Sequence, residues 1–243
     1  MVLTYNFAPA ANYFSNNQPS PIPTNNLLVY VNSKDPLSYN GVGSTFFDLS
    51  SNNNNMTINN CTWDNVNKVF NFNGSNSIIT TPDLLPQLRA SNAVISQTYE
   101  VWFKTSNDGV IVNETNNAGW HDTHIENIAN SLKGRYYITT PPVELGSNID
   151  SRWMYAALSY NGSTNQIFGN LNGTQTPITQ PFTRILNPNP GIISFNLGQG
   201  DSTNMGSGAF FNGQMAIYRI YKRALTNTEI VNNYNAQKAL FGL

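Results

Sequence analysis

Two Asn-Gly steps, each placed after a short apolar segment, limit the middle of this chain to antiparallel hairpins. The segment "RWMYAALSY" (152–160) precedes Asn161-Gly162, and "QIFGNL" (166–171) precedes Asn172-Gly173. Asn and Gly tolerate the positive φ that two-residue hairpin turns require. The order strand, turn, strand, turn therefore predicts consecutive antiparallel strands.

Further segments have the composition or the period-two alternation of strands. In one of them, "TYEVWFKT", Tyr99, Val101 and Phe103 would face one side of a sheet, and the residues between them would face the other. The segments are 27–31, 68–74, 98–105, 191–200 and 213–221. Many short strands separated by turns are typical of a β-sandwich.

One helix is predicted at the C-terminal end. Thr226 and Glu229 form a capping box, in which each side chain satisfies a free backbone donor of the other. Ile230 and Tyr234 follow at helical spacing, so we expect a helix from about 227 to 239. The predicted fold class is all-β, a two-sheet antiparallel sandwich with a short C-terminal helix.

The first 26 residues differ from the rest. The stretch "FAPAANYFSNNQPSPIPTNN" is rich in Pro and Asn and lacks apolar periodicity. We therefore expect an extended N-terminal arm over 1–26 and a single sandwich domain over 27–243. The arm could be a linker, a disordered tail or a strap on a neighbouring subunit; its aromatic residues favour the strap.

The charge balance excludes some partners. Only 10% of the residues are charged and the net charge is −1, so no basic face for nucleic acid is expected. No apolar run approaches the roughly 20 residues that span a bilayer, so membrane insertion is not expected. A neutral polar surface suits an extracellular or virion-surface protein, but the high Asn content is explained equally well by an AT-rich genome, because Asn codons are AT-rich.

Several motifs, in their order along the chain, carry a family resemblance over about 27–243. "LLVYVNSKDPLSYNGVGSTFFDLSSNNNN", "FNFNGSNSIIT" and "GQMAIYRIYKRALTNTEIVNNYNAQKALFG" resemble the opening, an early strand and the closing strand and helix of concanavalin A-like, laminin-G-like jelly-roll domains. The form with "GWHDTHIE" and "GQGDSTNMGSG" is similar to such domains in structural proteins of tailed phages and large DNA viruses.

This resemblance implies a viral structural protein, namely a capsid-surface, decoration or fibre component used for capsid assembly or host attachment. The expected partners are other virion proteins, reached through the arm, and host-surface glycans, and the expected location is the virion surface. The alternative is a carbohydrate-binding lectin module of an extracellular or cell-surface protein. An atypical glycoside hydrolase is a third hypothesis.

Catalytic patterns are missing from the sequence. The glucanase branch of the superfamily carries alternating carboxylates on one strand, which places acid and nucleophile on one face. Glu100 lacks such partners, because Trp102 and Lys104 occupy the alternate positions. We therefore expect a protein that is not an enzyme.

The segment "GWHDTHIE" and its surroundings are the predicted contact surface. Sugar recognition combines an aromatic face with amide, imidazole or carboxylate hydrogen-bonding groups. Trp120 could equally belong to the core. The candidate contact residues are Asn116, Asn117, Trp120, His121, Asp122, His124 and Tyr136.

Metal binding stays open. His121 and His124 would point to opposite faces of a strand, which argues against zinc. The superfamily's calcium site often uses an Asp in the closing strand, and here that position is Ala216. Asp201, Ser202 and Asn204 are weak calcium candidates, with a polar β-turn as the alternative. No cofactor is expected, and calcium is possible.

Overall fold

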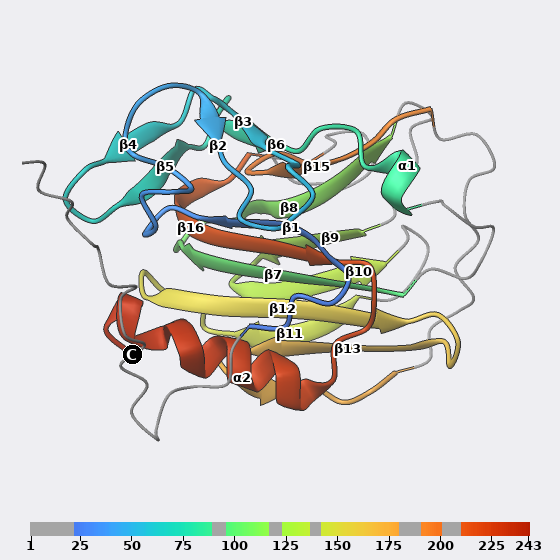
Figure 1. The fold of residues 1–243 in the computed structure, drawn as a ribbon. Helices are drawn as coiled ribbons and strands as arrows, with labels where there is room; N and C mark the ends of the chain where they lie inside the picture. The colour runs from blue at the N-terminus through green and yellow to red at the C-terminus, as the bar shows by residue number, and fades with distance from the viewer. Residues whose placement is uncertain (1–21, 89–95, 117–122, 137–141, 180–190, 201–209) are drawn as a thin grey trace, which may run out of the picture.

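The computed structural model describes residues 22–88, 96–116, 123–136, 142–179, 191–200 and 210–243. Two antiparallel sheets stack face to face, and a C-terminal helix covers the outer face of one of them (Figure 1). The predicted fold class is therefore confirmed. Residues 1–21 of the predicted arm lie outside the described residues.

The first sheet, called sheet A, carries the helix. Its strands follow the order β14-β13-β12-β7-β16-β5-β4, and β1 also pairs with β16. The strands are β1 (Leu27–Asn32), β4 (Thr62–Asp64), β5 (Val69–Asn73), β7 (Gln97–Lys104), β12 (Trp153–Asn161), β13 (Gln166–Leu171), β14 (Thr174–Gln175) and β16 (Asn212–Tyr221).

The second sheet, called sheet B, follows the order β11-β10-β9-β8-β15-β6-β3-β2. Its strands are β2 (Thr45–Phe46), β3 (Met56–Asn59), β6 (Ile78–Thr80), β8 (Gly109–Asn116), β9 (Thr123–Ile128), β10 (Ser131–Tyr136), β11 (Val143–Ser147) and β15 (Ile193–Leu197). A single-turn helix, α1 (Leu85–Leu88), lies between β6 and β7 in the chain.

Only one of the two predicted Asn-Gly turns has the expected form. Asn172 (φ 51°) and Gly173 (φ 86°) make the two-residue turn between β13 and β14. At the other site, β12 continues through Asn161 and the positive φ falls on Asn165. The Asn161 side chain accepts a bond from the backbone N–H of Ser163, which stabilises a longer loop.

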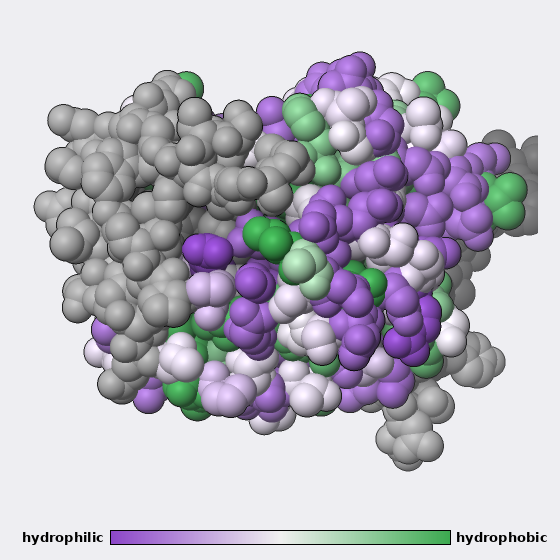
Figure 2. Space-filling model, turned by 180° about the vertical axis from the view of Figure 1, so that it is seen from behind, coloured by the Kyte–Doolittle hydropathy of each residue, from purple (hydrophilic) through white to green (hydrophobic). Residues whose placement is uncertain are grey.

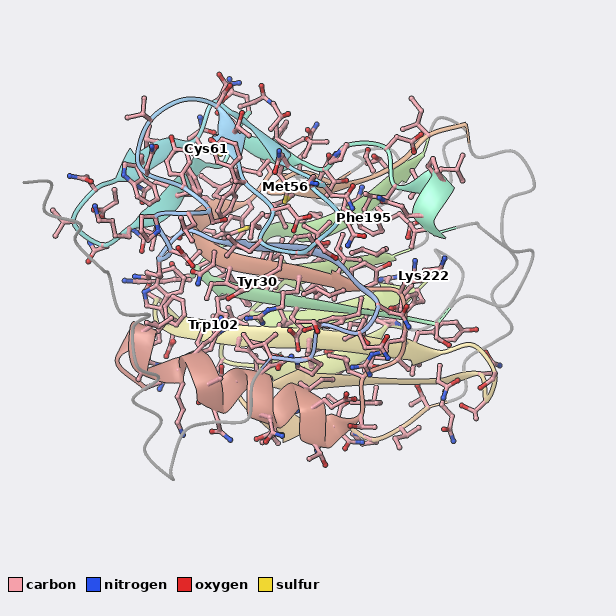
Figure 3. The ribbon with its side chains drawn as sticks, in the orientation of Figure 1. Tyr30, Met56, Cys61, Trp102, Phe195 and Lys222 are labelled. Carbon is pink, nitrogen blue, oxygen red and sulfur yellow. The ribbon has the colours of Figure 1, made fainter. Side chains whose placement is uncertain are left out.

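Strand β7 of sheet A is buried on both faces, so its alternating side chains lie in two different apolar layers. Tyr99, Val101 and Phe103 lie in the core between the sheets, together with Met56 and Phe195. Trp102 points the other way, toward the C-terminal helix, and is fully buried there (Figure 3). The hydrophobic effect therefore holds three layers together.

The C-terminal helix is α2 (Asn227–Gln237), followed by the 3₁₀ turn η1 (Lys238–Phe241). The Trp102 ring stacks on Phe241, with centroids 4.2 Å apart, and its Nε1 donates to Gln237 at 3.3 Å. In the described part of the chain, no helix is long and apolar enough to cross a bilayer.

A buried ionic cluster joins α2 to sheet A. Arg219 Nη1 donates to Glu100 at 2.9 Å, and both side chains are fully buried. Glu100 also accepts bonds from the Tyr155 hydroxyl (2.6 Å) and from Asn233 of α2 (2.9 Å). Burial alone would lower the pKa of Arg219, but the Glu100 carboxylate raises it above its ordinary value.

The segment 48–54, "DLSSNNN", satisfies the outer edge of β1. Asp48 accepts bonds from the backbone N–H groups of Tyr30 and Asn54, both at 2.8 Å. The side-chain amides of Asn52 and Asn54 donate to the backbone carbonyls of Leu27 and Leu28. Side chains thus replace a neighbouring strand at this edge.

The predicted capping box is confirmed, and it gives a pH-dependent prediction. Thr226 and Glu229 bond reciprocally, and Arg223 donates to Glu229 at 2.7 Å. The bond from Arg223 is the main reason why the pKa of Glu229 falls from 4.5 to about 2. A carboxyl group whose pKa is lower in the folded state stabilises the fold above its unfolded pKa, and that stability is lost as pH falls through the folded pKa.

We expect Glu229→Gln to lower the free energy of unfolding by about 0.5–1 kcal/mol at neutral pH, because Gln keeps the cap but loses the ion pair. The difference from the wild type should disappear as pH falls from 4.5 toward 2. Urea unfolding at a series of pH values measures it. A difference that persists at the acid end would assign the effect to packing.

Candidate functional site

A row of polar residues crosses the outer face of sheet B. Strand register aligns Thr80, Asn196, Asn113 and Arg135 on β6, β15, β8 and β10, with β9 paired between β8 and β10. We call these four residues the polar row. The adjacent row belongs to the core between the sheets: Ile79, Leu197, Val112 and Ile125. Period-two alternation therefore turns the polar row away from the core.

The centre of the polar row has unsatisfied hydrogen-bonding groups. Asn113 is 0% exposed, and neither its Oδ1 nor its Nδ2 meets a hydrogen-bond partner among the described residues. Asn196, directly opposite on β15, has a buried Oδ1 in the same condition. A buried polar group without a partner costs about 1–3 kcal/mol. Such groups call for a bound molecule with hydrogen-bonding capacity or for an ordered water.

The surroundings of the polar row are also polar. Thr115 and Ser194 share a hydrogen bond of 2.8 Å, and Arg135 pairs with Glu126 at 3.2 Å. Figure 2 shows the molecule from behind, where hydrophilic residues cover much of the described surface. Outward-facing amides, hydroxyls and an ion pair on one sheet give a surface that can both donate and accept hydrogen bonds.

Two of the predicted contact residues lie in the strands that flank the β8–β9 connection. Asn116 ends β8, and His124 is the second residue of β9. Asn117, Trp120, His121 and Asp122 lie outside the described residues. The strand that begins at Thr123 agrees with the expectation that "GWHDTHIE" leads into a strand.

Tyr136 was predicted to contact a ligand, and the structure corrects this. Its side chain is 0% exposed, and its hydroxyl donates to the backbone carbonyl of Gln97 at 2.9 Å. Its ring packs on Tyr99 and Tyr160. The reason is strand parity: Arg135 faces outward on β10, so the next residue must face the core.

The metal candidates are not described. Asp201, Ser202 and Asn204 lie outside the described residues, so calcium remains a prediction. Ala216, which occupies the position of the expected calcium-binding Asp, is buried on the helix side of sheet A. Among the described residues, no three His, Cys, Asp or Glu side chains gather as metal ligands.

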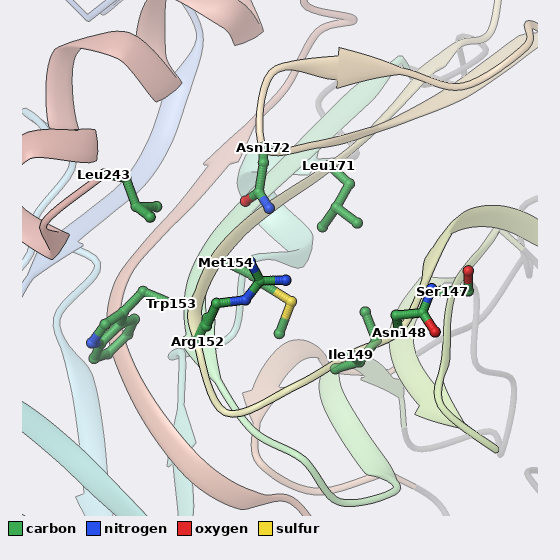
Figure 4. A pocket seen from close by; sticks show the side chains of 9 residues that line it. All are labelled: Ser147, Asn148, Ile149, Arg152, Trp153, Met154, Leu171, Asn172 and Leu243. Carbon is green, nitrogen blue, oxygen red and sulfur yellow. The ribbon is translucent and has the colours of Figure 1, made fainter.

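A separate pocket of about 130 Å³ lies where the open edges of the two sheets meet. We call it the Arg152 pocket. Figure 4 shows Arg152 and Met154 extending between Asn172 on one side and Ile149 on the other. The sheets come close here because β11 has Gly146, where an added Cβ would lie only 2.4 Å from Leu171 Cδ2.

The guanidinium group in this pocket is held from one edge. Arg152 Nε lies 2.7 Å from an Asp150 oxygen, and the Arg152 side chain is 76% exposed. The hydrogen bond from Arg152 lowers the pKa of Asp150 below its ordinary value, so the pair is ionised at neutral pH. Sequence reasoning missed this pocket, since nothing in "GSNIDSRWM" indicates where β13 lies.

The sequence matches no protein-family model and no curated protein, but solved structures share its fold. A Trypanosoma rangeli sialidase in complex with sialic acid matches with a TM-score of 0.66 and 15% identity, over 91% of this chain and 34% of the sialidase chain. The same sialidase with 2,3-difluoro-KDN gives a TM-score of 0.68 and 15% identity, over 96% and 36%. The binding domain of botulinum neurotoxin serotype D/C gives 0.64 and 14%, over 87% and 52%.

These matches correct one expectation and refine another. The prediction that the chain is not an enzyme is contradicted, because its fold occurs within chains that are sialidases. The chain spans about a third of the length of those sialidases, and at this identity the likeness is one of fold. The broader part of the resemblance, an antiparallel jelly-roll-like sandwich, is confirmed; its phage and viral form is not.

Proposed function

We propose that the chain is a carbohydrate-binding domain and that the polar row, with the neighbouring β8–β9 connection, forms its binding surface. The observation that carries the proposal is Asn196, which is only partly buried in this polar sheet face and whose Oδ1 has no hydrogen-bond partner among the described residues; Asn113, opposite it, is 0% exposed and therefore makes no direct contact. Sugar hydroxyls both donate and accept, so one sugar can satisfy the two kinds of amide atom.

The solved structures support this reading over the alternatives. One neighbour was determined with sialic acid, and another is the binding domain of a toxin. The viral structural role rests on the sequence resemblance alone and stays a prediction. If the chain does belong to a virion surface, many copies of a weak glycan site would give attachment by avidity.

Asn196→Leu tests the surface directly. It replaces a partly buried amide whose Oδ1 is unsatisfied with an apolar side chain of similar size, so stability should change little. Glycan binding, measured on an array with the full chain displayed multivalently, should fall by about tenfold or more, as expected when about 1.5–3 kcal/mol of hydrogen bonding is removed. Trp120→Ala should weaken the same signals if Trp120 contributes the aromatic face.

Asn71→Leu on sheet A is the matched control, because its amide bonds to Gln214 on the other side of the molecule. This variant should bind glycans as the wild type does. A wild-type chain that binds no glycan at high display density contradicts the proposal. Equal loss of binding in both Asn variants would show that the effect comes from the fold and not from the surface.

A further inference from the structure

We infer that the Arg152 pocket is a second ligand site, distinct from the polar row, which binds a carboxylate attached to a short aliphatic group. The pocket is lined by three segments that are far apart in the sequence: residues 147–154 from the end of β11 into β12, Leu171 and Asn172 at the β13–β14 turn, and Leu243. Its location at the meeting edges of both sheets separates it from the centre of sheet B.

The charge of the expected ligand follows from the charged and polar groups that line the pocket. Asp150 is engaged by Arg152 Nε, at 2.7 Å from Oδ2 and 2.8 Å from Oδ1. The side-chain oxygen Oδ1 of Asn172 accepts from the backbone N–H of Tyr155 at 2.8 Å. Among the residues that line the pocket, Arg152 carries the charged side chain, and Ser147 and Asn148 add exposed polar groups that both donate and accept. Arg152 Nη1 and Nη2 and Asn172 Nδ2 are donors for which no bond to another described residue is seen, so the pocket favours an anion.

The orientation of these donors is fixed before a ligand arrives. The Asp150 pair holds one edge of the guanidinium, and the bond to Tyr155 holds the Asn172 amide with its NH₂ turned away from that backbone. A guanidinium edge presents two parallel N–H groups, which match the two oxygens of a carboxylate. Preorganised donors also reduce the entropic cost of binding.

Most of the remaining lining residues are apolar, and they determine the uncharged part of the ligand. Met154 and Ile149 are 5% and 3% exposed, and the Leu171 side chain lies beside them (Figure 4). At about 30 Å³ for each water molecule, 130 Å³ holds about four. This space suits a branched group of a few carbon atoms. Sulfate or phosphate would satisfy the donors but leave the apolar lining without a partner.

The test uses ¹⁵N-labelled full-length chain and NMR titration with isobutyrate. Its matched control is isobutyramide, which has the same shape and no charge. Isobutyrate should produce saturable shifts of the Asn172 side-chain amide and the Arg152 Nε–H, with isobutyramide and sulfate each about tenfold weaker or worse. Glucuronate forms a further arm: tighter binding of isobutyrate supports the short aliphatic acid, whereas tighter binding of glucuronate would overturn it in favour of a sugar acid.

Two variants separate binding from folding. Arg152→Gln removes the charged donors at an exposed position. Asn172→Asp keeps the acceptor for Tyr155 and tolerates the positive φ of 51°, but it replaces the NH₂ group with a charged oxygen. Both should weaken isobutyrate binding by about tenfold. The charge control is Lys68→Asn, at the far end of sheet A, and it should bind as the wild type does.

Equal affinity for isobutyrate and isobutyramide would overturn the inference, and so would undiminished isobutyrate binding by Arg152→Gln. Binding of sulfate as tight as that of isobutyrate would overturn the aliphatic part. None of these results bears on the polar row, because the glycan array with Asn196→Leu reports on that surface separately.

Discussion

Replacing Arg219 with Met is expected to lower the free energy of unfolding by about 3–5 kcal/mol. Arg219 and Glu100 are 0% and 1% exposed, and they form the only ion pair with both side chains fully buried in the described part of the chain. Removing the cation leaves the Glu100 carboxylate in the interior without its charged partner. An uncompensated buried charge is among the most destabilising changes a single substitution can make.

The other surroundings of Arg219 make the stability of the fold depend more strongly on its ion pair with Glu100. Its guanidinium carbon lies 4.5 Å from the centre of the Tyr30 ring, and its Nε and Nη2 meet no hydrogen-bond acceptor among the described residues. Among the described residues, Glu100 is therefore the charged partner that offsets the desolvation of Arg219. Asn233 of α2 bonds to the same carboxylate, so the variant should also loosen the helix from sheet A.

Urea unfolding followed by tryptophan fluorescence measures the loss, because Trp102 lies between sheet A and α2. The control is the double variant Glu100→Gln with Arg219→Met. Gln keeps an acceptor for Tyr155 and Asn233 without a charge, so the double variant should recover much of the stability. If the double variant is less stable than Arg219→Met alone, packing rather than charge explains the effect.

The sequence could predict the faces of β7 but not this ion pair. Alternation places Glu100 and Trp102 on one side of the strand, and the capping box at Thr226 predicts the helix that covers them. The pairing of Glu100 with Arg219 joins residues 119 positions apart. It depends on β16 lying beside β7 in the final sheet, and no local pattern contains that information.

The candidate site shows the same limit. "GVIVNET" shows one Asn after an apolar run, but nothing in this segment predicts that β15 places Asn196 opposite Asn113. A register shift between Val110 and Val112 also breaks the simple alternation of β8. Tyr136 was misplaced for a related reason: composition suggested a contact residue, whereas the parity of β10 relative to the core decided its position.

The motif "DLSSNNNN", part of the sequence resemblance, has a structural role that its spacing did not predict. Asp48 and the Asn residues that follow it form hydrogen bonds with the outer edge of β1. Among the described strands, β1 pairs only with β16, so its other edge needs different partners. We therefore expect Asp48→Ala to lower the free energy of unfolding by about 3 kcal/mol, because the N–H groups of Tyr30 and Asn54 lose their acceptor in a buried site.

Thermal and urea unfolding check this value, and Asp64→Ala is the matched control. Asp64 also accepts backbone bonds, from Val66 and Asn67, but in an exposed turn where water can replace the carboxylate. Its loss should be much smaller. Asp48→Asn should lie between the two, since one side-chain oxygen remains for one of the two N–H groups. Equal effects of Asp48→Ala and Asp64→Ala would mean that the edge of β1 is satisfied by water, and the segment 48–54 would then be a loop lying beside β1 and not a replacement for a strand.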